Sequence, residues 1–283
     1  MTNFISEEER IRALPCWKGY VNVEPLKGGL SNQNFKVTDE NKCYVARVVG
    51  GDVPIHSVMR FNELTGLRAA YEIGITPGLV YDEPGLMIIE FIEGKTYSAQ
   101  DVQDMHNLKR IISVIKQLHD SGKNYIYGPC LGFWVFRICR SYAHYLRSSK
   151  IEMISKLDFF MDVCDELETK VGAVVNTFCH NDLLCANFIE SDDKLWVIDW
   201  EHCGYGARLF DLANIASNAD LPMSTEKSML EEYYGEELSV SRWKKYKAFR
   251  VASHLRETMW SMISEVYLDL DIDYETYTKQ NLE

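Results

Sequence analysis

Residues 178–214 of the chain are FCHNDLLCANFIESDDKLWVIDWEHCGYGARLFDLAN, in which polar side chains follow short apolar runs at fixed intervals. The triplet H-N-D occupies 180–182, and Asn187 follows five residues after its aspartate. A strand-like apolar run at 195–198 then leads directly into Asp199. The order is therefore H-x-D, four residues, N, and then a strand that ends in D.

This order is typical of phosphoryl-transfer enzymes. Transfer of a γ-phosphate needs an acceptor hydroxyl held in line and Mg²⁺ to neutralise charge on the phosphates. Asp182 would accept or orient the hydroxyl proton, and Asn187 and Asp199 offer the oxygen ligands that Mg²⁺ prefers. The alternative is that residues 180–182 only cap a turn. That alternative does not explain why a carboxylate follows the apolar strand, so the stretch predicts a kinase catalytic loop and a metal-binding aspartate.

The overall composition is that of a globular protein with an acidic surface. The chain has 283 residues, of which 46% are apolar and 25% charged, enough for one large domain or two lobes. Its net charge of −12 argues against nucleic acid or an anionic membrane as a partner, because phosphate groups require a basic patch. A cationic small-molecule substrate fits this charge.

The cysteines and the N-terminus favour a cytoplasmic location. Residues 1–10 are polar and acidic, without the apolar core of a secretory signal, and no apolar run approaches the roughly 18 residues of a membrane span. The eight cysteines include no C-x-x-C pair, which indicates reduced thiols. Cys179, Cys185 and Cys203, with His180 and His202 nearby, are the candidates for a zinc site, but their spacing fits no usual zinc pattern.

The first 92 residues predict an antiparallel sheet with one helix. Five strands are expected, at 21–26, 35–38, 43–49, 79–81 and 86–92. Between the first two, Gly28 and Gly29 allow close backbone approach to a phosphate, and the amides of Ser31 and Asn32 lie at the tip. An ordinary hairpin turn is the alternative reading of this loop, and a nucleotide-covering loop is the reading we favour beside the catalytic stretch.

A helix is expected at 57–71, with Ser57 as N-cap and Gly74 as stop. Its apolar stripe would be Val58, Phe61, Leu64, Leu67 and Ala70.

Arg47, on the third strand, is the expected clamp for the ATP phosphates, unless it is only a surface cation. Glu63 of the helix would pair with Arg47, and Glu72 is the competing candidate. The backbone from Glu90 to Ile92 would contact the adenine, just before a hinge between lobes at 93–95.

The rest of the chain predicts a helical lobe. Helices are expected at 101–119, 134–146, 151–171, from 209 onward, at 225–234 and at 240–268. His119 is expected to be a hydrogen-bonded core residue. The predicted division is an N-terminal nucleotide-binding lobe, 1–92, and a C-terminal catalytic and substrate-binding lobe, 93–283.

With these residues named, the chain resembles the choline/ethanolamine kinases of the aminoglycoside phosphotransferase-like superfamily. The resemblance runs from about Leu26 to Ile263. Four motifs carry it: H-N-D with the following asparagine, I-D-W-E at 198–201, F-D-L-A-N at 210–214 and G-G-L-S-N at 28–32.

The resemblance implies an α+β, two-lobed protein-kinase-like fold that uses ATP and Mg²⁺ to phosphorylate a small alcohol. It implies Asp182 as catalytic base, Asn187 and Asp199 as Mg²⁺ ligands, and Arg47 and Glu63 at the ATP phosphates. His180 and Asp211 would support the catalytic loop.

Choline is the acceptor that the resemblance favours. The run 254–261 is similar to a substrate-site helix with two tryptophans one turn apart, of which Trp260 keeps one while Glu257 replaces the other. A quaternary ammonium is bound by aromatic faces and carboxylates, and Tyr233 and Tyr234 are further candidates for that pocket. A core role for Trp260 is the alternative.

The chain departs from the family pattern at two places: Leu184 replaces a polar residue, and Asp220 is the only carboxylate close to Asn218. Both departures concern the acceptor rather than the phosphoryl transfer. Ethanolamine, thiamine, a sugar or an aminoglycoside are alternative acceptors, and a nucleotide-binding pseudokinase is the alternative of another class.

Overall fold

The structure, a computed structural model, describes residues 6–26, 33–48, 53–267 and 273–280. The predicted phosphate loop, with Gly28, Gly29, Ser31 and Asn32, lies outside these residues.

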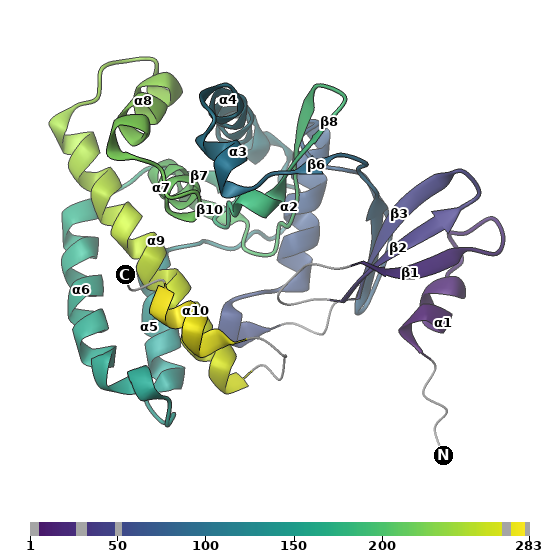
Figure 1. Ribbon diagram of the computed structural model, residues 1–283, viewed down its shortest axis with the longest axis horizontal. Helices are drawn as coiled ribbons and strands as arrows, with labels where there is room; N and C mark the ends of the chain where they lie inside the picture. The colour runs from purple at the N-terminus through teal and green to yellow at the C-terminus, as the bar shows by residue number, and fades with distance from the viewer. Residues whose placement is uncertain (1–5, 27–32, 49–52, 268–272, 281–283) are drawn as a thin grey trace.

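The N-terminal half is a five-stranded sheet, as predicted (Figure 1). Its strands are β1 (Asn22–Leu26), β2 (Gln33–Asp39), β3 (Lys42–Val48), β4 (Leu79–Glu83) and β5 (Leu86–Glu90). All neighbours pair antiparallel in the order β1-β2-β3-β5-β4. Alternate side chains of β2 are buried, and with the short helix α1 (Glu7–Arg12) they form a small hydrophobic core.

The helix after β3, α2 (Arg60–Glu72), differs in register from the prediction. Ser57 is not its N-cap, because it ends a 3₁₀ turn, Pro54–His56, with φ 60°. Val58, Leu67 and Ala70 of the predicted apolar stripe are buried, as expected. Phe61 is 42% exposed, and the buried face also carries Asn62 and Glu63. Polar contacts of Asn62 with the C-terminal half and of Glu63 with Arg47 on β3 therefore help to set the face that this helix buries. Gly74, with φ +75°, lies just past the end of the helix, where the sequence predicted its stop.

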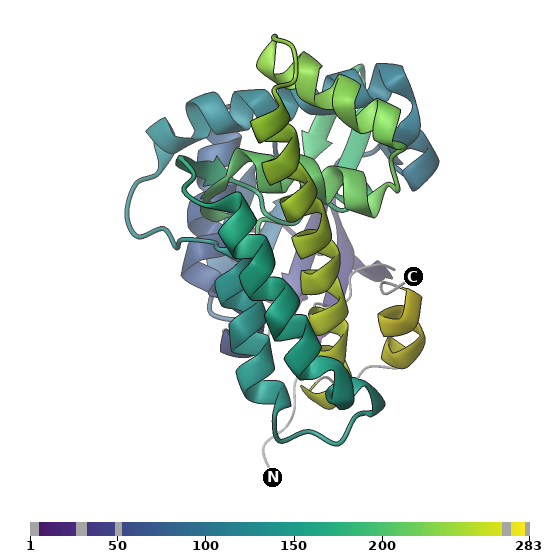
Figure 2. The same cartoon turned by 90° about the vertical axis from the view of Figure 1, so that its left-hand side faces the viewer.

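Helices dominate the C-terminal half (Figure 2). They are α3 (Ala99–Gln103), α4 (Met105–Ser121), α5 (Val135–Leu146), α6 (Leu157–Val171), α7 (Arg208–Asn218), α8 (Met223–Tyr234), α9 (Val240–Tyr267) and α10 (Tyr274–Gln280). The long helix α9 packs against α5, α6, α7 and α10. Among the residues described, none of these helices combines the length and apolar character needed to cross a bilayer.

Two predicted helices have different boundaries. The one expected at 101–119 is divided at Asp104, which ends α3 and caps α4 by accepting the N–H groups of His106 and Asn107. The one expected at 151–171 begins as a 3₁₀ turn, Glu152–Lys156. The helix α10 was not predicted.

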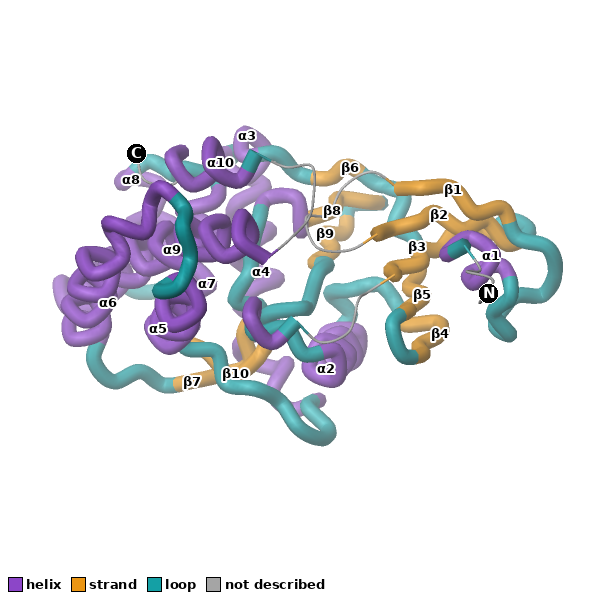
Figure 3. Tube along the Cα trace, turned by 90° about the horizontal axis from the view of Figure 1, so that it is seen from below, coloured by secondary structure: helices purple, strands orange, loops and turns teal. Residues whose placement is uncertain are grey.

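Two small sheets hold the catalytic stretch between the large sheet and the helices (Figure 3). One pairs β7 (Asn176–Cys179) with β10 (Gly204–Ala207). The other has the order β6 (Lys95–Thr96), β8 (Phe188–Ser191), β9 (Lys194–Val197). The expected hinge at 93–95 leads directly into β6, and the division of the chain into two domains there stays a prediction.

The helix α2 belongs to the larger of two hydrophobic cores. Its Leu67, Ala69 and Ala70 pack with the C-terminal helices, whereas the sheet and α1 form the smaller core. It therefore joins the two halves of the molecule.

Candidate active site

The catalytic loop is held by the start of α7. Asp211 accepts the backbone N–H groups of His180 at 2.9 Å and Asn181 at 2.7 Å, and Asn214 accepts the N–H of Leu183. Asn181 has a left-handed φ of 65°, a conformation that asparagine tolerates better than most residues. The predicted role of Asp211 in bracing the loop is confirmed.

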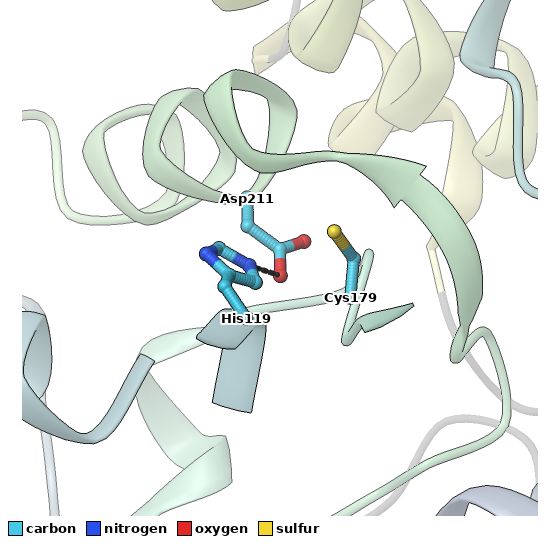
Figure 4. A group of neighbouring side chains, drawn as sticks. All are labelled: His119, Cys179 and Asp211. Atoms are coloured by element: carbon cyan, nitrogen blue, oxygen red, sulfur yellow. Dashed lines mark hydrogen bonds and ion pairs between the residues drawn. The ribbon is translucent and has the colours of Figure 1, made fainter. Parts of the chain in front are cut away.

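A second layer supports that aspartate (Figure 4). His119 lies with its Nε2 3.0 Å from Asp211 Oδ2 and its Nδ1 2.7 Å from the Tyr233 hydroxyl, and Cys179 is adjacent. Both ring nitrogens are engaged within the protein, so this group of side chains is a buried brace, not an ion site. His119 is the hydrogen-bonded core residue that the sequence predicts. Tyr233 belongs to this brace, and its proposed part in an ammonium pocket is wrong.

His180 connects the catalytic loop to the strand that precedes Asp199. Its Nδ1 accepts the N–H of Asp182 at 3.2 Å, and its Nε2 donates to the Ile198 carbonyl at 2.9 Å. Its ring lies 4.7 Å from the buried Trp200 ring. These contacts fix the loop aspartate relative to Asp199, in agreement with a supporting role.

Asn187 and Asp199 are brought together by the backbone. The N–H of Ile198 donates to the Asn187 carbonyl at 3.0 Å, and Asn187 Nδ2 donates to the Asp182 carbonyl at 2.9 Å. That bond uses the amide nitrogen, so the atom left to bind a cation is the oxygen. Asp199 has φ 70°, an uncommon conformation that is concentrated at functional sites. The two oxygen donors suit Mg²⁺.

Arg47 lies at the centre of an acidic cluster. Its guanidinium contacts Glu63 at 3.1 Å, Asp199 at 2.9 Å and Glu201 at 2.7 Å. Arg60 contacts Glu63 at 2.7 Å and Glu201 at 2.8 Å. The predicted Arg47–Glu63 pair is confirmed.

Glu72, the competing partner, is exposed at the end of α2. Arg60 and Glu201 were not predicted as site residues, although Glu201 belongs to the I-D-W-E motif.

Burial opposes ionisation of this cluster. It raises the pKa of Glu63 and of Asp199, and Arg47 counteracts that effect in both. Asp182 behaves differently. Burial would raise its pKa, but the charge and hydrogen bond of Arg256, with further help from His202, hold it below the usual value. Asp182 is therefore kept ionised.

On the acceptor side, Asp182 meets the helix α9. Arg256 Nη1 lies 2.7 Å from Asp182 Oδ1 and also contacts Glu257. Trp260, one turn further, has ring neighbours in His56 at 5.7 Å and Tyr274 at 6.1 Å. The structure thus places Glu257 near Asp182, because Arg256 contacts both carboxylates. The placement of Trp260 in an acceptor pocket stays a prediction.

Several acceptor-side residues were not predicted. Arg256 was missed, although a charged residue beside Glu257 on a largely buried helix was a visible signal. Tyr274 was also missed, because it lies on the unpredicted α10. Tyr234, the other proposed aromatic, packs instead with Arg242 3.8 Å over its ring.

The expected nucleotide side is less defined. A cavity of about 20 Å³ is lined on one side by Arg47 and Asp199 and on the other by apolar side chains of β5 and of Ile198. Its other lining residues are Glu63, Leu67, Thr76, Pro77, Met87, Ile89, Ile198 and Trp200. Glu90 exchanges hydrogen bonds with Gly78, through its backbone N–H and its side chain, both at 2.9 Å. Contact of Glu90 and Ile92 with adenine stays a prediction.

The cysteines near the loop do not converge on an ion. Cys185 and Cys203 each donate to a different backbone carbonyl at 3.4 Å, those of Asn218 and Asn62. All eight thiols are free, as predicted.

A braced loop aspartate, an asparagine and a second aspartate between a sheet and a helical half define a protein-kinase-like phosphotransferase. The chain belongs to the choline/ethanolamine kinase family, whose sequence model matches residues 23–231. It is accordingly a phosphotransferase that acts on an alcohol acceptor. The resemblance and the fold class that the sequence predicts are both confirmed.

Individual members of the family are distant from this chain. Ethanolamine kinase 2 of Mus musculus is 23% identical over 295 residues, which cover 93% of this chain and 75% of that protein. The solved choline kinase LicA from Streptococcus pneumoniae has a TM-score of 0.78 at 22% identity, covering 92% of both chains. A structure of LicA in complex with AMP has a TM-score of 0.75 at 21% identity, covering 93% of this chain and 91% of that one.

Proposed function

We propose that this protein transfers the γ-phosphate of ATP to the hydroxyl of a small cationic amino alcohol. The observation that carries the proposal is the assembly of Asp182, Asn187 and Asp199, with Arg47 beside the last of them. A pseudokinase is disfavoured, because none of the three residues that we propose as base and metal ligands is replaced in this chain. The names of the relatives, an ethanolamine kinase and a choline kinase, and the AMP complex of LicA support the same reaction.

Each residue has a role in this proposal. Asp182, kept ionised by Arg256, orients the acceptor hydroxyl and accepts its proton. Asn187 and Asp199 would hold Mg²⁺, which supplies neutralisation of charge on the phosphates. Glu63 and Glu201 fix the guanidinium of Arg47 beside Asp199, where it would bind phosphate oxygens.

Local charge favours a monocationic acceptor. Two carboxylates, Asp182 and Glu257, and one guanidinium, Arg256, leave a net charge of −1 on this side. Trp260 and Tyr274 add aromatic faces. Choline and ethanolamine both meet these requirements, and choline, the acceptor that the sequence favoured, stays a prediction. A neutral sugar would leave the charge unbalanced.

The proposal is tested by ADP release with Mg·ATP and a panel of amino alcohols, sugars and aminoglycosides. We expect turnover of amino alcohols and a drop in kcat of about 10²–10⁴-fold in Asp182→Asn, the contribution usual for a general base. ATP affinity should be unchanged, because Asp182 faces the acceptor. Near-normal kcat in this variant would remove Asp182 from its role.

A further inference from the structure

On the acceptor side of the site, a buried ion pair occupies the place where aromatic side chains would surround a quaternary ammonium. Arg256 is 2% exposed and Glu257 6% exposed, on the part of α9 that faces Asp182. One guanidinium nitrogen of Arg256 contacts both carboxylates. A carboxylate accepts several hydrogen bonds, so Glu257 keeps accepting capacity beyond this contact.

Two neutral polar groups, the imidazole of His56 and the hydroxyl of Tyr142, lie near this ion pair. His56 is buried between the Trp260 ring at 5.7 Å and the Tyr142 ring at 6.1 Å. Within the described part of the chain, the two ring nitrogens of His56 and the hydroxyl of Tyr142 have no hydrogen-bond partner. Both residues are close enough to Arg256 to feel its charge. His56 lies in the 3₁₀ turn Pro54–His56, Tyr142 on α5 and Arg256 on α9, so polar side chains from three elements gather around Arg256.

The polar groups of Glu257, His56 and Tyr142 would distinguish between ammonium groups by hydrogen bonding. A primary ammonium donates up to three hydrogen bonds and can satisfy a carboxylate, an imidazole nitrogen and a hydroxyl together. A trimethylammonium donates none, so its methyl groups would leave these buried atoms unpaired. Sites built to pair with a donor reject analogues that lack it more strongly than apolar pockets reject an extra methyl.

We propose that Arg256 and Glu257, with His56 and Tyr142, make this pocket select an alcohol with a hydrogen-bond-donating ammonium over one with a quaternary ammonium. This selectivity rests on the proposed function, since it concerns the acceptor of that reaction. Glu257 binds the ammonium group. Arg256 is a positioning residue that contacts both carboxylates and holds Glu257 beside Asp182, so that ammonium and hydroxyl are held at once.

The first test needs no variant. The kcat/KM of the wild-type protein is measured with ethanolamine, N-methylethanolamine, N,N-dimethylethanolamine and choline at saturating Mg·ATP. We expect a stepwise fall, with the largest step at choline, which loses the last donor, and a total of about 10- to 100-fold, the range for hydrogen bonds to a charged group. Equal values or a preference for choline would overturn the selectivity and leave the kinase intact. No turnover of any of the four would overturn the proposed acceptor class as well.

The second test assigns the selectivity to Glu257. Glu257→Gln keeps the size and removes the charge, and Glu232→Gln, at an exposed position of α8, is the matched control. We expect Glu257→Gln to raise KM for ethanolamine about tenfold or more while changing the constants for choline little, so that the ratio between the substrates falls. The control should keep the wild-type ratio. An unchanged ratio in folded Glu257→Gln, checked by its thermal midpoint, would remove Glu257 from this role.

Discussion

Arg47 is the single residue on which most of the buried charge depends. It balances Glu63, Asp199 and Glu201, of which Glu63 and Glu201 are buried. Arg47→Met would leave these carboxylates with only Arg60 near them, and breaking a buried pair from one side costs about 3–5 kcal/mol. We expect a loss of that size in the free energy of unfolding, measured with urea without Mg²⁺.

The control for this variant is Arg47→Lys, which keeps the positive charge but loses the forked guanidinium that can contact several carboxylates. It should recover part of the stability, because one ammonium can contact fewer carboxylates at once. If Arg47→Met unfolds within about 1 kcal/mol of the wild-type protein, then Arg60 alone balances the cluster and the central position of Arg47 is wrong.

The sequence predicted residues whose spacing follows from the chemistry, and it missed those whose role depends on a distant neighbour. Asp182, Asn187 and Asp199 lie within 18 residues in one stretch, so their pattern is local. Arg256 is 74 residues from Asp182, and only the folding of α9 over the catalytic loop brings the two together. His56 is separated from Trp260 by most of the chain, and its environment has no local signature.

At the scale of the elements, α2 packs closely at Gly66, where a small change has a large effect. A side chain on Gly66 would overlap the Cys203 Sγ and approach the Phe178 ring. Gly66→Ala should improve the intrinsic helix propensity by about 1 kcal/mol. We nevertheless expect a net destabilisation of about 1–3 kcal/mol, because overpacking forces the helix away from Cys203 and Phe178.

A double variant checks that cause. Cys203→Ala removes the overlapping sulfur, so Gly66→Ala with Cys203→Ala should be more stable than the sum of the two single changes predicts, as measured by thermal unfolding. Additive effects would show that the loss comes from another contact of α2.

Element boundaries were predicted less well than element types. The five strands were recognisable because strand residues alternate or cluster between turn residues. The register of α2 was not, since its buried face is chosen by Asn62 and Glu63 contacts that no hydrophobic pattern shows. The helix α10 is short, and what fixes it is a contact with α9, where Thr278 lies 2.6 Å from Ser261.

At the scale of the whole molecule, two buried histidines couple stability to pH. Burial lowers the pKa of His56 to about 4 and that of His202 to about 4, and nearby Arg256 adds to both shifts. An unfolded histidine has a pKa near 6.5, so between pH 6.5 and 4 the unfolded chain binds more protons than the folded one. Their contribution to stability is therefore complete above pH 6.5 and is lost as the pH falls to 4.

Buried carboxylates act in the opposite direction over part of this range, because burial raises the pKa of Glu63 and of Glu257. The total pH profile consequently mixes both effects, and only a difference between proteins isolates the histidines. His56→Phe keeps an aromatic ring between Trp260 and Tyr142 and removes the titrating group. His106→Phe, at an exposed position of α4, is the matched control.

We expect the free energy of unfolding of His56→Phe to decline less than that of the wild-type protein between pH 6.5 and 4. The difference should reach at most about 3 kcal/mol, since each pKa unit corresponds to about 1.4 kcal/mol. His106→Phe should follow the wild-type curve. A His56→Phe curve parallel to the wild-type one would mean that His56 becomes protonated within the folded protein at an ordinary pH. A protonated His56 has no free nitrogen to accept a hydrogen bond from the ammonium group, so this outcome would also weaken the part that His56 plays in the proposed selectivity.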